Sequence, residues 1–308
     1  MRVAVDAMGG DAAPREIVAG ALLAARERDD LEPVLVGDEA AIRSCLAALW
    51  EELGPELRLS IEPRIHVRHA PTVIGMEASP VEALRRAPDS SIGRAVQLVA
   101  EREAEAVVTA GNTGAAVAAT HQALGRIKGI RRPGIAVLLP SKGKNPVVVV
   151  DVGATVKCQP IHLFHFGVMG DGFARTLLNI EQPRIGLLNI GEEDEKGNEL
   201  VRKTRAMFTQ SRFRFIGNVE GQEIHRDRCD VVVCEGFVGN VVLKVTEGTA
   251  EFAAGWIEKA LAGDDSDGAR RLKEIIAARA DFSNYGGAIL LGVNGICIIC
   301  HGRSNRRA

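Results

Sequence analysis

The chain has 308 residues, of which 46% are hydrophobic and 25% charged, and its net charge is −2. This is the composition of an ordinary globular protein, and the balanced charge excludes a strongly basic nucleic-acid-binding chain. No apolar run approaches the roughly 18 residues of a transmembrane helix. The N-terminal residues do not resemble a signal peptide, so the six cysteines predict reduced thiols and a cytoplasmic location.

Short apolar runs alternate with amphipathic stretches along the chain, and this alternation predicts an α/β fold with a mainly parallel sheet and helices on both faces. The expected strands are 2–6, 33–37, 65–69, 106–110, 135–139, 147–151, 184–189, 214–217, 231–234 and 296–301. The expected helices are 14–28, 39–52, 91–103, 113–124, 162–178, 200–211, 240–261 and 269–280. The segment 53–63 has the weakest pattern. We expect one catalytic unit over 1–308, containing a helical hairpin over 247–280.

Four polar, glycine-rich segments follow or surround apolar runs, at 110–114, 189–198, 235–240 and 286–302. Glycine lets a backbone approach a ligand closely because it carries no Cβ. The ends of strands are where α/β proteins hold their ligands. We therefore expect the four segments to form one composite site for an anionic ligand, with Gly286 and Gly287 opening the last of them.

The turn after the first strand, Asp6 to Asp11, contains Gly9 and Gly10, which permit a tight reversal. Asp11 is expected to cap the helix that starts near Pro14. Two interpretations remain open. The segment is either only a turn with a cap, or also one wall of the site.

Gly111 to Gly114 open a helix of small residues, and backbone N–H groups at a helix start attract phosphate. Asn112 and Thr113 can add side-chain hydrogen bonds. The segment lacks the Walker A and dinucleotide-binding glycine patterns. The alternative is a capped helix that packs closely on the sheet without a ligand.

Lys196 follows four consecutive acidic residues, 192–195. It could clamp phosphate or stabilise developing negative charge, whereas the alternative is a solvated surface loop. Gly236, Gly239 and Asn240 repeat the strand-to-helix arrangement, with Lys244 one turn into the helix. Asn240 is expected to cap this helix and to face a ligand.

His301 ends the last expected strand, beside Gly302, and is either a structural histidine or a site residue. Cys297, Cys300 and His301 match the literal haem-attachment spacing, but residues three apart on a strand face opposite sides. Two buried strand cysteines are the favoured interpretation. No zinc or other metal site is expected, because no second close Cys/His pair is present.

Two surface features complete the pattern. Four cations lie within seven residues, and could be simply solvated or could dock an acidic partner: Arg126, Lys128, Arg131 and Arg132. In the expected hairpin, two apolar stripes flanked by basic residues suit either packing or an anionic lipid surface. They comprise Phe252, Trp256, Ile257, Ala260 and Leu261, then Leu272, Ile275 and Ile276, with Arg270, Arg271, Lys273 and Arg279 alongside.

Together and in this order, these segments resemble the bacterial acyl-[acyl-carrier-protein]:phosphate acyltransferases (the PlsX family) over nearly the whole chain. The segments that carry the resemblance are 6–11, 90–91, 110–115, 129–133, 187–193, 196–197, 236–240, 243–244, 247–248, 286–292 and 301–302.

The resemblance implies an isocitrate/isopropylmalate-dehydrogenase-like fold and a homodimer without a metal or organic cofactor. The implied reaction converts long-chain acyl-[acyl-carrier-protein] and inorganic phosphate into acyl phosphate and free carrier protein. A glycerol-3-phosphate acyltransferase would then use the product for phospholipid synthesis. Release at the bilayer favours peripheral attachment to the inner face of the plasma membrane through 247–280.

For this reaction, helix N-termini after Gly111 and Gly239, with Lys196, would hold phosphate, while Asn112 or Asn240 would stabilise the oxyanion. The leaving thiolate would take a proton from His301 or Lys196, and the sequence does not choose between them.

The chain departs from the family at Glu235, which replaces aspartate, and at Thr155 and Lys157, which replace asparagine and aspartate. It also ends soon after Arg306, where the family continues into a last helix. The alternatives are a phosphotransacylase that uses acyl-CoA and a catalytically weakened membrane-surface organiser. A nicotinamide-dependent dehydrogenase is disfavoured, since no aspartate cluster for its metal is evident.

Overall fold

A computed structural model describes residues 1–264, 266–280 and 286–308, with side chains described up to Ile276 in the last helix. The chain forms two compact units. Unit 1 comprises Met1–Pro133 and Gly287–Ala308, and unit 2 comprises Gly134–Gly286. The expectation of one catalytic unit over 1–308 stays a prediction.

The sheet of unit 1 has the strand order β3–β2–β1–β4–β11–β10. Neighbouring strands are parallel, except that β10 is antiparallel to β11. The strands are β1 (Arg2–Asp6), β2 (Glu32–Gly37), β3 (His66–His69), β4 (Ala106–Thr109), β10 (Ala288–Leu291) and β11 (Ile296–Ile299).

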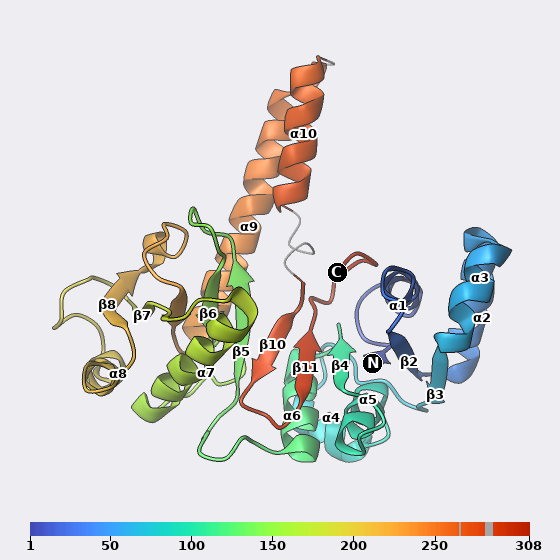
Figure 1. Cartoon of the computed structure of the whole chain (residues 1–308), viewed down its shortest axis with the longest axis horizontal. Helices are drawn as coiled ribbons and strands as arrows, with labels where there is room; N and C mark the ends of the chain where they lie inside the picture. Colours follow the sequence, from blue (N-terminus) through green and yellow to red (C-terminus); the bar gives the residue numbers. More distant parts are fainter. Residues whose placement is uncertain (265, 281–285) are drawn as a thin grey trace. The chain divides into compact units, whose positions relative to one another are not determined.

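Helices cover this sheet. They are α1 (Arg15–Glu27), α2 (Glu39–Leu53), α3 (Pro55–Ile61), α4 (Pro80–Arg86), α5 (Ser91–Ala100) and α6 (Thr113–Leu124) (Figure 1). Val5 and Leu35 join the buried faces of α1 and α2 in one apolar cluster, while α5 contacts β1, β2 and β4. This packing fixes the positions of β1 and β4 in the sheet. It therefore also fixes where the turns that follow them lie.

The sheet of unit 2 has the order β5–β6–β9–β7–β8, parallel except that β5 is antiparallel to β6. Its strands are β5 (Gly134–Leu139), β6 (Val147–Val150), β7 (Ile185–Asn189), β8 (Phe215–Glu220) and β9 (Val231–Val233). Its helices are α7 (Pro160–Leu178), α8 (Glu199–Thr209), α9 (Gly236–Ala260) and α10 (Asp267–Ala280). The predicted hairpin is confirmed, since α9 and α10 pack against each other (Figure 1).

The predicted α/β class with a mainly parallel sheet is confirmed, and each predicted strand and helix is present with ends shifted by a few residues. Two α-helices and one strand of the described residues were not predicted. Helices α3 and α4 have only seven residues each, too few for a periodic pattern. Strand β10 was merged into the last glycine-rich segment, where Gly292 to Gly295 in fact turn the chain between β10 and β11. Within the described residues, no helix is long and apolar enough to cross a membrane.

Candidate active site

The predicted site turns leave the carboxyl edge of each parallel sheet. In unit 1 the neighbouring strands β1, β4 and β11 end at Asp6, Thr109 and Ile299. In unit 2 the neighbouring strands β6, β9 and β7 end at Val150, Val233 and Asn189. Ligands of open α/β sheets bind outside such strand ends. The structure thus gathers the turns into two groups, and a single composite site stays a prediction.

Asp6 is the buried centre of the unit 1 group. It is 2% exposed, and its Oδ2 accepts a hydrogen bond from the Thr109 hydroxyl at 2.7 Å. The Thr109 oxygen accepts in turn from the backbone N–H of Gly111 at 3.0 Å. Burial raises the pKa of the Asp6 carboxyl, against hydrogen bonds from Ser91 and Thr109 that favour the ionised form. Asp6 therefore ties the first turn to the start of α6.

Gly9 and Gly10 allow the three turns of unit 1 to touch. A Cβ on Gly9 would lie 2.7 Å from both Asp6 Oδ2 and the Gly111 nitrogen. Gly10 has a φ of +104°, and its Cβ would lie 3.1 Å from the carbonyl oxygen of Gly302. Both positions are restricted to glycine by their neighbours within the protein.

The prediction that Asp11 caps the first helix is wrong. Pro14 is the N-cap of α1, and the helix start has no side-chain capping hydrogen bond. Asp11 lies three residues before that cap, too early for its carboxylate to serve the first turn. Its backbone N–H instead donates to the Gly302 carbonyl at 2.8 Å, which joins the first turn to the segment after β11.

Asn112 has its hydrogen-bonding groups engaged by the protein. Its Oδ1 accepts from the Ala115 N–H at 3.0 Å and caps α6. Its Nδ2 lies 3.3, 2.9 and 3.2 Å from the carbonyl oxygens of Gly75, Met76 and Ala78. An amide has two N–H donors, so these carbonyls occupy both of them. The geometry favours a role for Asn112 in holding the 75–78 loop, and its oxyanion role stays a prediction.

The start of α6 offers Thr113 to solvent, whereas Gly111 is buried. A Cβ on Gly114 would lie 2.5 Å from Pro80 Cγ, so the absence of a side chain lets α4 pack on α6. Gly114 thus has a packing role that needs no ligand. Thr113 remains the side chain of this turn that a ligand can reach.

His301 follows β11 at the same edge and is exposed. Its Nδ1 accepts a hydrogen bond from the Arg303 backbone N–H at 3.2 Å. Both cysteines are free thiols, and Cys297 is buried in β11 as predicted, whereas Cys300 is half-buried and lies just after the strand. A Cβ on Gly287 would lie 2.5 Å from Ile298 Cγ2, so this glycine serves strand packing, while Gly286 is exposed with a φ of +72°.

Asp151 is the buried centre of the unit 2 group, and the sequence interpretation did not single it out. It is fully buried and accepts four backbone N–H bonds of 2.7 to 3.0 Å, from Ile135, Gly153, Ala154 and Thr155. Burial raises the pKa of its carboxyl, while the four N–H groups favour the ionised form. The signal was present in the sequence as an aspartate directly after a run of four valines.

Thr155 connects this turn to α9. Its carbonyl accepts from the Gly236 N–H at 3.0 Å, and its own N–H donates to Asp151 at 2.7 Å. These contacts use the main chain, which threonine and asparagine share. The departure from the family at Thr155 therefore leaves the observed turn intact. Lys157, the charge-reversed position, is exposed.

The prediction that Asn240 caps the second site helix is wrong. Helix α9 starts four residues earlier, at Gly236, with Glu235 at the N-cap and no side-chain cap bond. The reason is that Gly236 and Gly239 pack on the Asp151 turn, where a Cβ on Gly239 would lie 1.9 Å from the Asp151 carbonyl oxygen. Asn240 is exposed on the second turn. Lys244, also exposed, pairs with Glu247 at 2.9 Å.

Lys196 lies in the loop 190–198, between β7 and α8. Its side chain is exposed, and its stem lies over Gly191, whose Cβ would be 3.2 Å from Lys196 Cγ. Glu192 and Asp194 pair with Arg228 and Arg205. Among the described residues, no carboxylate lies within ion-pair distance of the Lys196 ammonium. The acidic run is thus an anchored loop, and Lys196 is its unpaired cation.

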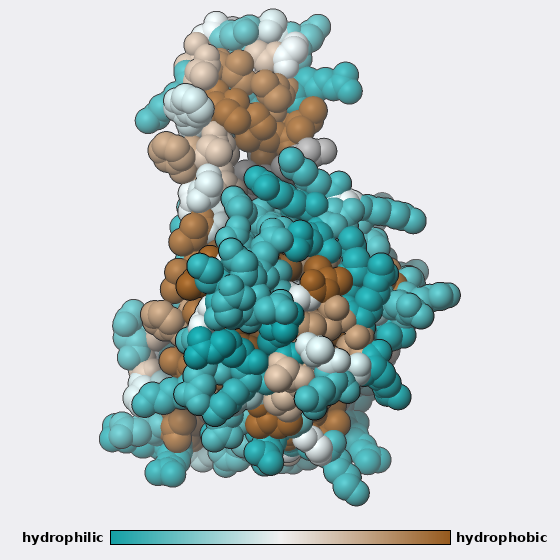
Figure 2. All heavy atoms as spheres, turned by 90° about the vertical axis from the view of Figure 1, so that its left-hand side faces the viewer, coloured by the Kyte–Doolittle hydropathy of each residue, from teal (hydrophilic) through white to brown (hydrophobic). Residues whose placement is uncertain are grey.

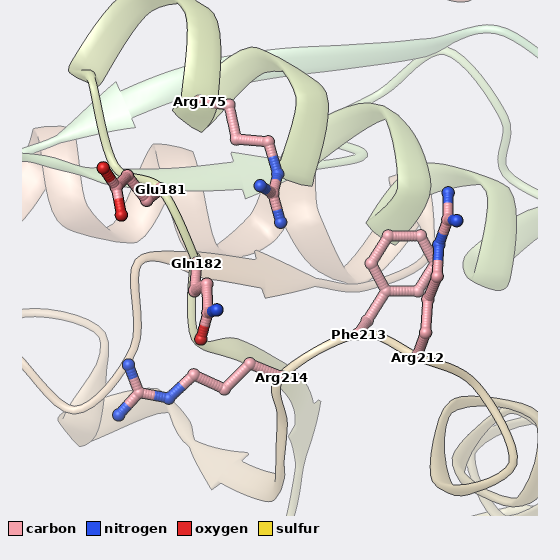
Figure 3. A pocket seen from close by; sticks show the side chains of 6 residues that line it. All are labelled: Arg175, Glu181, Gln182, Arg212, Phe213 and Arg214. Atoms are coloured by element: carbon pink, nitrogen blue, oxygen red, sulfur yellow. The ribbon is translucent and has the colours of Figure 1, made fainter.

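A separate polar hollow of about 440 Å³ lies at the amino ends of β7 and β8 (Figure 3). Its cations are Arg175, Arg212 and Arg214. Arg175 is satisfied by Asp171, at 2.6 Å, and Glu181 also lines the hollow. Because the hollow lies at the amino ends of the strands and Lys196 follows the carboxyl end of β7, the two lie at opposite edges of the unit 2 sheet. Within the described ranges, no group of three or more His, Cys, Asp and Glu could hold a metal ion.

Comparison with known proteins gives consistent matches over the full length. A family model described as "Fatty acid synthesis protein" matches residues 1–308. A "Phosphate acyltransferase" of Pelotomaculum thermopropionicum is 47% identical over 317 residues, covering 100% of this chain and 88% of the relative. One of Geobacter sulfurreducens is 46% identical over 314 residues, covering 100% and 87%.

Solved structures share the fold at low sequence identity. A phosphotransacetylase from Streptococcus pyogenes has a TM-score of 0.61 at 16% identity, covering 99% of this chain and 89% of that one. A putative 4-hydroxythreonine-4-phosphate dehydrogenase from Salmonella typhimurium has a TM-score of 0.51 at 16% identity, covering 99% and 95%. These likenesses bear on the fold and are consistent with the dehydrogenase-like architecture expected from the sequence.

Proposed function

We propose that this chain, which belongs to the phosphate acyltransferase family, transfers a long-chain acyl group from acyl carrier protein to inorganic phosphate. The observation that carries the proposal is the full-length identity of 46 to 47% with proteins named for phosphate acyl transfer. The chain is therefore an acyltransferase, and the donor and the pathway are the proposed part.

In the proposed reaction a phosphate oxygen attacks the thioester carbonyl carbon. The C–S bond then breaks, and the departing thiolate takes a proton to give the free thiol. Phosphate is already a nucleophile, so the protein has to desolvate it, position it and compensate its charge. The N-termini of α6 and α9 and the unpaired Lys196 suit this task. His301 and Lys196 both remain candidates for the proton donor.

Acyl carrier protein is favoured over coenzyme A as the donor by the basic loop of unit 1. Arg126, Lys128, Arg131 and Arg132 are all exposed. Asn294 holds the loop by donating to the carbonyls of Leu124 and Arg126 at 3.2 and 3.0 Å. A fixed cluster of cations suits an acidic protein partner. A phosphotransacylase reaction with acyl-CoA is the second candidate, and the phosphotransacetylase of Streptococcus pyogenes shares the fold.

Helix α9 supports two further parts of the proposal. Phe237, Val241 and Val245 recur every four residues and are 46 to 61% exposed, which suits a homodimer contact. Further along, Phe252 and Trp256 are exposed on the hairpin, which suits peripheral attachment to a membrane where acyl phosphate is released. A glycerol-3-phosphate acyltransferase would consume that product in phospholipid synthesis.

A single assay tests the proposal. Purified protein is incubated with long-chain acyl-[acyl-carrier-protein], with or without inorganic phosphate, and acyl phosphate is trapped with hydroxylamine as the hydroxamate. We expect phosphate-dependent hydroxamate and loss of the thioester without added metal or nucleotide. Faster turnover with acyl-CoA would favour the phosphotransacylase. No turnover by folded protein would favour the weakened membrane-surface organiser.

A further inference from the structure

The loop that carries Lys196 is held mainly by polar contacts. Between the loop and the turn from α8 to β8 lies a hollow of about 370 Å³. Glu192 and Asp194 of the loop line it, opposite Arg205, Arg228 and Asn218. Because this side of the loop faces a hollow and not a packed core, its hydrogen bonds and ion pairs determine where its backbone lies.

Asn218 makes the most direct of these contacts. It lies on β8 and is 2% exposed, and its Nδ2 donates to the carbonyl oxygen of Glu193 at 2.8 Å. The same oxygen accepts the backbone N–H of Lys196 at 3.2 Å. One carbonyl therefore connects a buried amide to the main chain of Lys196.

The remaining anchors are spread along the loop. Asp194 pairs with Arg205, and Glu192 with Arg228 at 2.9 Å. Arg202 donates to the Gly197 carbonyl at 2.8 Å. Gly197 has a φ of +90°, and a Cβ there would lie 2.4 Å from Asn189 Oδ1. The carboxylates of Glu192 and Asp194 are thus paired with arginines and not with Lys196, whose ammonium can meet a ligand.

We propose that Asn218 is a positioning residue that acts on the reaction through Lys196. The inference rests on the proposed function and on a charge-compensating role for Lys196 within it. A cation that must meet developing charge loses most of its effect when displaced by about 1 Å. Removing the Asn218 amide frees the Glu193 carbonyl and with it the turn that presents Lys196.

A double-mutant cycle tests the proposal, with hydroxamate formation as the assay. Lys196→Ala should lower kcat about 10- to 100-fold. Asn218→Leu, which keeps the side-chain size but removes the donor, should lower kcat roughly tenfold and leave KM for the acyl donor unchanged. In the Lys196→Ala background, Asn218→Leu should change kcat by less than about twofold, because its effect passes through the missing lysine.

Val219→Ala is the matched control, since Val219 is the fully buried neighbour on the same strand. It should lower stability but keep kcat while the protein is folded. If Asn218→Leu does not fold, Asn218→Ser replaces it in the same cycle. Normal kcat in the Asn218 variant, an equal loss in both backgrounds, or a normal rate for Lys196→Ala would each overturn the inference. No hydroxamate from the unmodified chain would instead refute the proposed function.

Discussion

At the scale of single residues, the start of α9 depends on the absence of a side chain at Gly239. Its Cβ would lie 1.9 Å from the Asp151 carbonyl oxygen and 2.9 Å from Cys234 Sγ. The obstacle at 1.9 Å is backbone, which cannot rotate away as a side chain would. The sequence suggested Gly239 as a ligand-approach glycine, whereas the structure gives it a packing role that explains the residue without a ligand.

We therefore predict that Gly239→Ala destabilises the fold by about 3 kcal/mol or more, because α9 must shift away from the Asp151 turn. Gly248→Ala on the same helix is the control, since a Cβ there meets nothing within 4 Å. It should leave stability unchanged or raise it by about 0.5–1 kcal/mol. Urea unfolding of both variants checks this. Similar unfolding midpoints for the two variants would contradict the prediction and show that α9 can shift to accommodate a Cβ at Gly239.

A second residue-scale prediction concerns pH. Arg306 donates to Glu16 of α1 and lowers the pKa of that carboxyl to about 2. A lowered pKa means that this ion pair contributes fully above the ordinary value of 4.5 and loses its contribution as pH falls toward 2. Because the pair is partly exposed, we expect a contribution of only about 1 kcal/mol.

Glu16→Gln should thus be less stable than the parent at pH 7, and the difference should shrink steadily from pH 4.5 to pH 3. Urea unfolding at several pH values measures it. Glu39→Gln is the control, since Glu39 pairs with Arg43 one turn away on an exposed helix surface. A difference independent of pH would mean that Glu16 acts through packing and not through its charge.

At the scale of elements, the hairpin of α9 and α10 exposes apolar surface that the described residues do not cover. Phe252 and Trp256 are 74% and 70% exposed, and Leu272 and Ile275 about 42%. Figure 2 shows hydrophobic side chains gathered on the hairpin between polar ones. Phe252 and Trp256 therefore do not pack in the core formed by the described residues. The side chain of Arg279, expected beside this surface, lies outside the described residues.

We predict that Phe252→Ser with Trp256→Ser reduces co-sedimentation with anionic vesicles several-fold at low salt, because both side chains would insert at the lipid surface. Ile257 is half-buried and a poorer choice, since its loss would also disturb the hairpin. Leu59→Ser, which removes a side chain 76% exposed on α3, should have no effect. Sizing of the variants is the second readout. A fall from dimer to monomer would assign the surface to subunit contact.

The elements show which parts of a fold a sequence reveals. Continuous valine runs made β6 and β9 visible, because a strand buried on both faces leaves no polar alternation. The start of α9 was misplaced because glycine, here Gly236 and Gly239, ordinarily disfavours helix, and tertiary packing on the Asp151 turn outweighed that propensity. Local pattern cannot contain that information, since Asp151 lies more than eighty residues away in the chain.

At the scale of the whole molecule, the two sheets bring distant glycine-rich turns to common edges, and the sequence predicted this much because the turns follow strands of a mainly parallel sheet. The sequence did not reveal the contacts that join the turns at each edge. The close backbone approach of Gly10 to Gly302 and the hydrogen bonds from Asn112 to the 75–78 loop join residues far apart in the chain, which no local pattern reveals. Asn218, one bond from the Lys196 loop, had no sequence signal because an isolated asparagine in a strand has no characteristic spacing.

The proposed association with an acidic carrier protein is the whole-molecule property that charge should control. Among the described residues, no carboxylate lies within ion-pair distance of Lys128 or Arg132. The cations are close enough to act together, since Arg126 and Arg132 both help, after burial, to lower the pKa of His121. We predict that Lys128→Glu with Arg132→Glu raises KM for acyl-[acyl-carrier-protein] about tenfold at low salt and leaves kcat unchanged.

The matched control separates local docking from overall charge. Lys142→Glu with Lys144→Glu changes the net charge of −2 by the same amount, but in an exposed loop of unit 2. If docking uses the 126–132 loop, only the first pair raises KM, and raising salt shrinks the difference, because charges more than about 10 Å apart are screened at 0.1 M. Equal effects of both pairs would mean that long-range charge, and not this loop, attracts the carrier protein. An unchanged KM in both would place the docking surface elsewhere on the molecule.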